Sequence, residues 1–161
     1  TRYGLPDQQL ELELTESVLL HDAQEMEQVL ASLTRQGLRL SIDDFGTAYS
    51  SQTYLKKLAI HRLKIDRKFI CGLPDDEGDS AIVKAVLGMG RALGFSVVAE
   101  GVETQEQRLA LHTMGCEYYQ GFLCAPALSA AEFRSRVLGP SAVEQKHQSK
   151  RTPCRSRAAK R

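Results

Sequence analysis

The chain has 161 residues, of which 42% are hydrophobic and 25% are charged. This balance is typical of a soluble globular domain of ordinary size and excludes a low-complexity disordered chain. No apolar run approaches the length that spans a membrane, so we expect a cytoplasmic protein whose membrane anchor, if it has one, lies in segments that precede this sequence.

The formal charge of +1 is unevenly distributed along the chain. Residues 141–161 hold seven basic residues and one acidic residue, so this segment carries +6 and the rest of the chain −5. The segment also has few apolar residues and cannot bury enough surface to order itself. We therefore predict a folded domain at residues 1–139 and a disordered basic tail at residues 140–161. Such a tail can contact anionic surfaces, but a solvated terminus is more common, and we predict no specific nucleic-acid partner.

Short apolar runs alternate with helix-length segments in the first part of the chain. Residues 10–14 and 38–42 have Leu or Ile at every second position, which predicts two strands with one apolar face each. In a barrel, the leucines of the first strand would meet the outer helices. Residues 23–36 carry an apolar stripe at helical spacing, and Gly37 is a natural stop for that helix. A short helix is expected at residues 51–58.

The same alternation continues through the middle of the chain. Residues 62–65 and 95–99 are the third and fourth predicted strands. Between them we expect a polar loop at residues 72–78 and a helix at residues 79–93. The core stripe of that helix is predicted to be Ile82, Val83, Val86 and Leu87.

The last predicted strand is residues 118–123, and it follows a helix at residues 105–114. Thr104 is the expected N-cap of that helix, and a final helix is expected to begin near Ser129, which has Glu132 at capping-box spacing. Strict alternation of strands and helices predicts an α/β fold with a parallel sheet.

Polar residues recur at the far ends of the predicted strands, and they are Glu13, Glu16, Asp43, Asp44, Lys64, Glu100 and Gln120. Parallel strands joined by helices place their carboxyl ends on one side of a sheet or barrel, so these side chains should meet. Clustered carboxylates repel one another and usually hold hard divalent metal ions. In a regular strand Asp44 would point away from Asp43, so a shared site requires the backbone to turn there, and Phe45-Gly46 fits such a turn.

Five ordered strings carry a family resemblance: LELELTES at residues 10–17, DDFGTAYSS at 43–51, LKID at 63–66, VVAEGVET at 97–104 and QGFL at 120–123. Together they resemble the EAL domain, a family of bacterial cyclic di-GMP phosphodiesterases. The match runs from about residue 4 to about residue 138. The resemblance implies a modified (β/α)8 TIM-type barrel, of which this chain supplies roughly the last five βα units.

The resemblance also implies hydrolysis of cyclic di-GMP to linear pGpG at a two-metal site that uses Mg²⁺ or Mn²⁺. Glu13 and Asp43 would bind one metal, Asp43 would bridge to the second, and Asp44 would bind the second. Lys64 would hold the attacking water or the phosphate, and Glu100 would act near the second metal or as general base.

Further residues are implied to support the substrate or the loop beside the site. Gln120 would support metal-bound water or substrate. Glu16 would tether the loop that begins with Phe45, Gly46 and Thr47, which shapes the dinucleotide site and often the dimer contact. We therefore expect a homodimer in the complete protein, with a possible sensory or GGDEF domain upstream.

Some family features are absent from this sequence. The Glu-Ala-Leu segment and the Asn-bearing strand that should precede residue 10 are missing, and both contribute metal ligands in the family. Ala48 stands where the family loop usually has a second glycine. We therefore expect a fragment of a longer protein or a truncated remnant, incomplete and inactive alone. The alternative is a catalytically inactive cyclic di-GMP binding or interaction module, and an enolase-like lyase is disfavoured by the motif series.

Overall fold

A computed structural model describes residue 4 and residues 9–16, 18, 23–46, 55–56 and 58–138. The chain forms two compact units, residues 1–124 and residues 125–161, and each is described by itself. Most of the predicted helix at residues 51–58, together with Thr47, Ala48 and the basic tail, lies outside the described residues.

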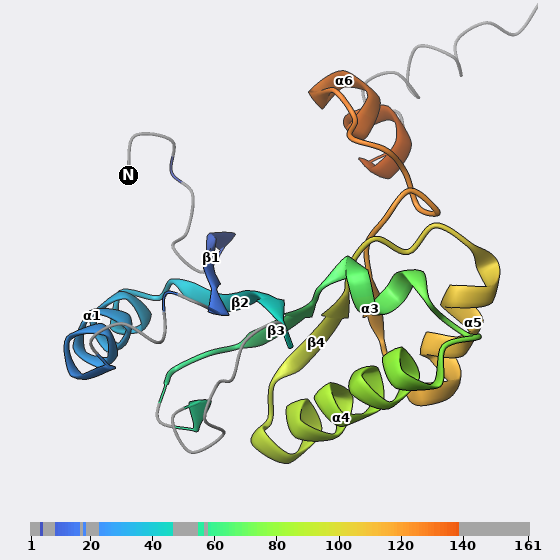
Figure 1. Cartoon of the computed structure of the whole chain (residues 1–161). Helices are drawn as coiled ribbons and strands as arrows, with labels where there is room; N and C mark the ends of the chain where they lie inside the picture. The colour runs from blue at the N-terminus through green and yellow to red at the C-terminus, as the bar shows by residue number, and fades with distance from the viewer. Residues whose placement is uncertain are drawn as a thin grey trace, which may run out of the picture. The chain divides into compact units, whose positions relative to one another are not determined.

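The first unit is built on a sheet of five parallel strands in the order β1-β2-β3-β4-β5 (Figure 1). The strands are β1 (Glu11–Thr15), β2 (Arg39–Phe45), β3 (Arg62–Ile65), β4 (Ser96–Ala99) and β5 (Tyr118–Tyr119). Parallel neighbours in chain order need a crossover after every strand, which is the pattern of consecutive βα units. The α/β prediction is confirmed, and the sheet corresponds to five consecutive strands of a modified (β/α)8 barrel.

Four helices of this unit are described: α1 (Ala23–Arg35), α3 (Arg67–Cys71), α4 (Glu77–Leu93) and α5 (Gln105–Met114). Figure 1 shows α4 running along β3 and β4, and residue contacts join α4 to both strands. The core lies between the helices and one face of the sheet, where Leu40, Ile42, Leu63 and Ile65 are each 0% exposed. Burial of this apolar face is the main force that holds the unit together.

The start of α4 differs from the sequence prediction. The Asp76 side chain accepts a hydrogen bond from the Asp79 backbone N–H, so Asp76 is the N-cap and the helix begins at Glu77. The predicted loop at residues 72–78 is therefore shorter than expected. Val83 and Leu87 are buried as predicted, but Ile82 is 36% exposed because it lies beside the buried stripe and not on it. Its assignment to the core was wrong.

The predicted caps of the later helices are confirmed. Thr104 caps α5 in a capping box with Gln107, and Gly115 ends the helix at a φ of 82°. In the second unit, Ser129 caps α6 (Ala130–Phe133) in a capping box with Glu132. A π-helical turn, Arg134–Leu138, follows α6 directly.

The leucines of the predicted first strand, residues 10–14, do not all meet an outer helix as predicted. Leu10 is 47% exposed and Leu12 is 40% exposed, whereas Leu14 is partly buried against the core. Alternation along a strand shows which side chains share a face but does not show what covers that face.

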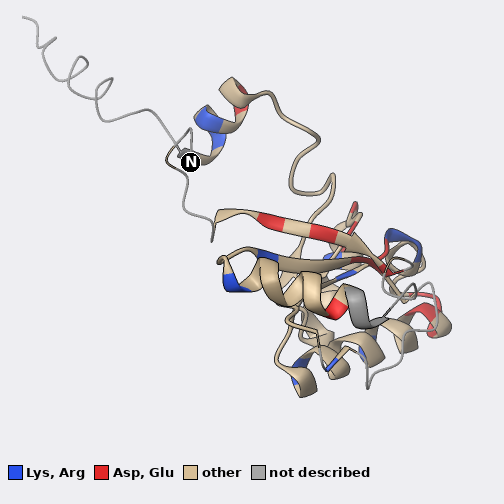
Figure 2. Ribbon diagram, turned by 90° about the vertical axis from the view of Figure 1, so that its left-hand side faces the viewer, with Lys and Arg blue, Asp and Glu red and all other residues tan. Residues whose placement is uncertain are grey.

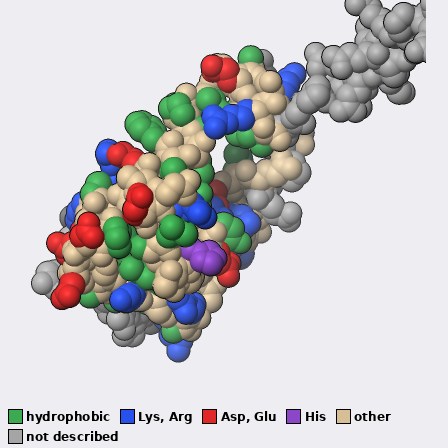
Figure 3. Space-filling model, turned by 90° about the vertical axis from the view of Figure 1, so that its right-hand side faces the viewer, with side chains coloured by type: hydrophobic (Ala, Val, Ile, Leu, Met, Phe, Trp, Pro, Cys, Tyr) green, Lys and Arg blue, Asp and Glu red, His purple; other side chains and the backbone are tan. Residues whose placement is uncertain are grey.

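On the face of the molecule that Figure 3 presents, apolar side chains lie interspersed with charged ones. Among the described residues, we find no helix with the length and apolar content needed to cross a bilayer.

We expect Leu63→Ala to lower the free energy of unfolding by about 2–5 kcal/mol, because it leaves a cavity in the centre of the sheet. Urea unfolding of the full-length protein measures this change. Leu109→Ala removes the same atoms from a side chain that is 55% exposed, so its effect should stay within about 0.5 kcal/mol. Equal shifts for the two variants would contradict the position assigned to the core.

Candidate functional site

Four side chains from different strands meet at the carboxyl-end edge of the sheet. Glu13 comes from β1, Asp43 from β2 and Lys64 from β3, and Glu100 follows β4 directly. Lys64 Nζ lies 2.9 Å from Glu13 Oε1, 3.0 Å from Asp43 Oδ1 and 2.7 Å from Glu100 Oε1. The strand register produces this meeting, since Thr15 pairs with Asp43 and Lys64 pairs with Val98. Three acidic residues therefore surround one ammonium group. Figure 2 shows the Asp and Glu residues of the strands in red.

The backbone of β2 turns where a shared acidic site would require it. Asp44 has a φ of +54°, in the left-handed region, which aspartate and asparagine tolerate better than most residues. The pairing of β2 with β3 also shifts between Ile42 and Phe45, as in a β-bulge. Asp44 itself makes the turn, whereas the sequence indicated Phe45-Gly46.

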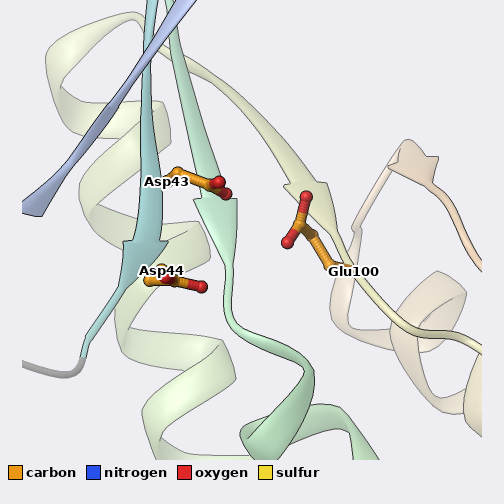
Figure 4. Close-up of side chains that lie close together, drawn as sticks. All are labelled: Asp43, Asp44 and Glu100. Atoms are coloured by element: carbon orange, nitrogen blue, oxygen red, sulfur yellow. The ribbon is translucent and has the colours of Figure 1, made fainter.

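This turn brings Asp44 to the same side as Asp43. One carboxylate oxygen each from Asp43, Asp44 and Glu100 lies within 4.8 Å of the others. Figure 4 shows Asp43 and Asp44 pointing from the end of β2 toward Glu100, which reaches back from the end of β4. Glu13 does not belong to this trio and instead contacts Lys64.

The trio fits a hard divalent cation. Its donors are all carboxylate oxygens, which suit Mg²⁺ or Mn²⁺ and not the softer metals that prefer thiolates. Three like charges at this separation repel one another, and a cation between them would offset the repulsion. The residues present therefore fit a hard divalent cation.

Lys64 and Glu100 at this edge have shifted pKa values. Burial alone would lower the pKa of Lys64. The contacts with Glu100, Glu13 and Asp43 raise that pKa by more than burial lowers it, so the net shift is upward and the amine stays charged. Burial raises the pKa of Glu100, and Lys64 offsets part of that rise. The negative charges of Asp43 and Glu13 raise the pKa of Glu100 further.

Gln120 lies next to Glu100. Its Nε2 donates a hydrogen bond of 2.6 Å to Glu100 Oε1. The backbone of Gln120 is fixed on both sides, because its N–H donates to Ala99 O at 2.9 Å and its carbonyl accepts from Val102 N at 3.0 Å. The predicted strand at residues 118–123 is shorter than expected, because β5 ends at Tyr119 and the chain turns at residues 122–124. Gln120 thus directly follows β5 and holds the carboxylate of Glu100.

Glu16 lies behind the acidic edge and is 2% exposed. Its Oε2 accepts a hydrogen bond of 3.2 Å from the backbone N–H of Gly46, at the start of the loop that the sequence assigned to it. Gly46 has a φ of +98°, and an added Cβ there would lie 3.0 Å from the ring of Phe69. Phe45 is 5% exposed and belongs to the core.

Sequence reasoning missed a second polar contact that lies one layer deeper. Arg62 Nη1 lies 3.0 Å from Glu11 Oε1 and 2.9 Å from Glu11 Oε2, and Arg62 Nε donates to Ser96 Oγ at 3.2 Å. Arg62 and Glu11 stand two residues before Lys64 and Glu13 on the same strands, so they share a face with them. That spacing was the available signal. Arg62 thus ties β1 to β4 directly beneath the acidic edge.

The segment after Glu100 is also fixed by contacts that the sequence did not single out. Gln107 Oε1 accepts hydrogen bonds from Glu103 N at 2.8 Å and from Thr104 N at 3.1 Å. The Glu103 side chain pairs with Arg67 Nη2 at 2.6 Å. These contacts join the ends of β3 and β4 and limit the positions that Glu100 can take.

Comparison with known proteins identifies close relatives. The model of the EAL domain matches residues 1–127. Over 136 residues the chain is 45% identical to MucR of Pseudomonas aeruginosa, named a bifunctional diguanylate cyclase/cyclic di-GMP phosphodiesterase. The match covers 84% of this chain and 20% of MucR, so the chain spans about a fifth of that relative's length.

Two solved structures resemble the fold. The PaMucR phosphodiesterase in its c-di-GMP complex has a TM-score of 0.79 at 45% identity, over 82% of this chain and 53% of that one. BlrP1 of Klebsiella pneumoniae, in a manganese/cyclic di-GMP complex, has a TM-score of 0.71 at 34% identity, over 76% of this chain and 31% of that one.

Proposed function

This chain belongs to the EAL domain family, and we propose on that premise that its protein hydrolyses cyclic di-GMP to linear pGpG with divalent metal ions, Mg²⁺ or Mn²⁺. The observation that carries the proposal is the convergence of Asp43, Asp44 and Glu100 within 4.8 Å, beside the charged Lys64. The printed names of MucR and of its c-di-GMP complex support the substrate, and the manganese complex of BlrP1 supports the kind of metal.

Each residue of the site has its own role in the proposed hydrolysis. Asp43, Asp44 and Glu100 would hold a divalent cation, and Glu13, which contacts Lys64, would add a further carboxylate beside them. A bound metal would polarise water and offset charge on the phosphoryl oxygens. Lys64 donates hydrogen bonds to a non-bridging oxygen of the phosphate. Glu100 borders the same point and would also take a proton from the attacking water. The new P–O bond forms as the bond to the ribose 3′ oxygen breaks, and that oxygen takes a proton from solvent and leaves as a hydroxyl.

The supporting residues keep these groups in position. Gln120 holds the Glu100 carboxylate through its 2.6 Å hydrogen bond. Glu16 holds the backbone of Gly46, where the loop that includes Phe45 and Thr47 leaves β2. We further propose that residues 1–139 act as the catalytic part and residues 140–161 as a solvated basic tail. We also propose that the protein is a cytoplasmic homodimer with a sensory or GGDEF domain upstream.

The test is metal-dependent turnover. The full-length protein is incubated with cyclic di-GMP and Mg²⁺ or Mn²⁺, and pGpG is followed by chromatography. We expect pGpG to appear, excess EDTA to stop its formation, and added metal to restore it, because the carboxylates alone cannot polarise water.

Two other outcomes contradict the proposal in different ways. Binding of cyclic di-GMP by calorimetry without any turnover would show a binding module that has lost catalysis. Absence of both binding and turnover would reject cyclic di-GMP as the ligand.

A further inference from the structure

Lys64 contacts three carboxylates at once. Its Nζ lies between 2.7 and 3.0 Å from oxygens of Glu13, Asp43 and Glu100. These contacts are ion pairs, and Asp43 Oδ1 accepts no hydrogen bond, so the attraction between opposite charges and not a full set of hydrogen bonds joins the ammonium to the three carboxylates. The Lys64 side chain is 8% exposed, so water solvates its ammonium group only slightly. The carboxylates therefore supply most of the stabilisation of this charge.

Two of the three carboxylates belong to the trio that fits a divalent cation. Asp43 and Glu100 each contact Lys64, and each also has a carboxylate oxygen within 4.8 Å of one from Asp44. A cation drawn to the same two carboxylates meets the positive charge of Lys64 at short range, and the two repel each other.

We propose that Lys64 is a resident counter-cation, which holds Glu13, Asp43 and Glu100 together in the metal-free protein and competes with a divalent metal for Asp43 and Glu100. The inference rests on the metal requirement of the proposed function. Lys64 is then a positioning residue until metal binds. Once metal binds, its ammonium is released from the carboxylates and becomes available to a phosphate oxygen.

The test is Lys64→Met in the full-length protein, which keeps an unbranched side chain of similar length and removes the charge. Without metal, we expect a lower melting temperature than in the wild type, because the carboxylates lose their counter-charge. We expect Mn²⁺ to bind about tenfold or more tightly, measured by calorimetry, because no ammonium has to be displaced. A merely structural role for Lys64 would weaken metal binding instead.

Lys68→Met is the matched control. Its side chain is 50% exposed and lies 3.7 Å from Asp66, so the same chemical change should leave Mn²⁺ affinity and melting temperature near the wild-type values. Weaker or unchanged Mn²⁺ binding by K64M overturns the inference and leaves the proposed function intact. Absence of Mn²⁺ binding by wild type and variant overturns both.

A second measurement keeps the inference testable if K64M does not fold. In wild-type protein with ¹⁵N-labelled lysine, the Lys64 ammonium protons should exchange slowly with water in the metal-free state, because three carboxylates hold them. Mg²⁺ should make that exchange as fast as the exchange of the exposed Lys68 ammonium. A Lys64 signal that remains protected at saturating Mg²⁺ would overturn the competition.

Discussion

Asp44→Asn is expected to reduce hydrolysis of cyclic di-GMP by the full-length protein about 10³-fold, since a charge that holds metal contributes several kcal/mol to transition-state stabilisation. Asparagine tolerates the left-handed conformation that Asp44 adopts at φ +54°, so the turn at the end of β2 should survive. The loss would then report the missing charge and not a damaged backbone. Steady-state kinetics at saturating Mn²⁺ measures the effect.

Asp75→Asn is the control for this prediction. Asp75 is exposed in the turn that precedes α4, and the same chemical change there should leave turnover within twofold or so of the wild type. A melting temperature for D44N close to that of the wild type would exclude unfolding as the cause. Undiminished turnover in D44N would show that Asp44 holds no metal needed for catalysis.

The sequence located the elements that have a local signal. Thr104 and Ser129 each precede a helix with Gln107 or Glu132 three residues later, a pattern that a single window reveals. Asp76 was missed as a cap because it stands in the acidic run Asp75-Asp76-Glu77, where several residues can cap equally well. The five residues of α3 are too few to show helical periodicity.

For the site, too, the sequence predicted the features that have a local signal and missed those that depend on how the strands pack. The sequence placed Asp43, Lys64 and Glu100 at strand ends, and the parallel register then brought them together. It did not show that one ammonium contacts three carboxylates, because this depends on the distances between strands. The Arg62–Glu11 contact was missed although its spacing was visible, since the pair lies below the strand ends where ligands were sought.

Replacement of Gly121 is expected to have the second large effect, a loss of folding stability. An added Cβ at Gly121 would overlap the backbone of Val102, which cannot move aside as a flexible side chain would. Val102 accepts a hydrogen bond of 3.0 Å from Leu123 N and donates one of 3.0 Å to Gln120 O, so the two segments are held tightly together. We expect Gly121→Ala to lower the free energy of unfolding of the full-length protein by about 3 kcal/mol or more, measured in urea.

Gly88→Ala separates this clash from the general effect of replacing glycine. Gly88 is exposed in α4, and its added Cβ meets no atom within 4 Å, so alanine should stabilise the protein by about 0.5–1 kcal/mol through its higher helix propensity. The two variants add the same methyl group with opposite expected signs. G121A should also slow hydrolysis, because the segment that it displaces carries the Gln120 hydrogen bond to Glu100. A G121A variant as stable and active as the wild type would mean that this segment packs less closely on Val102 than the structure has it.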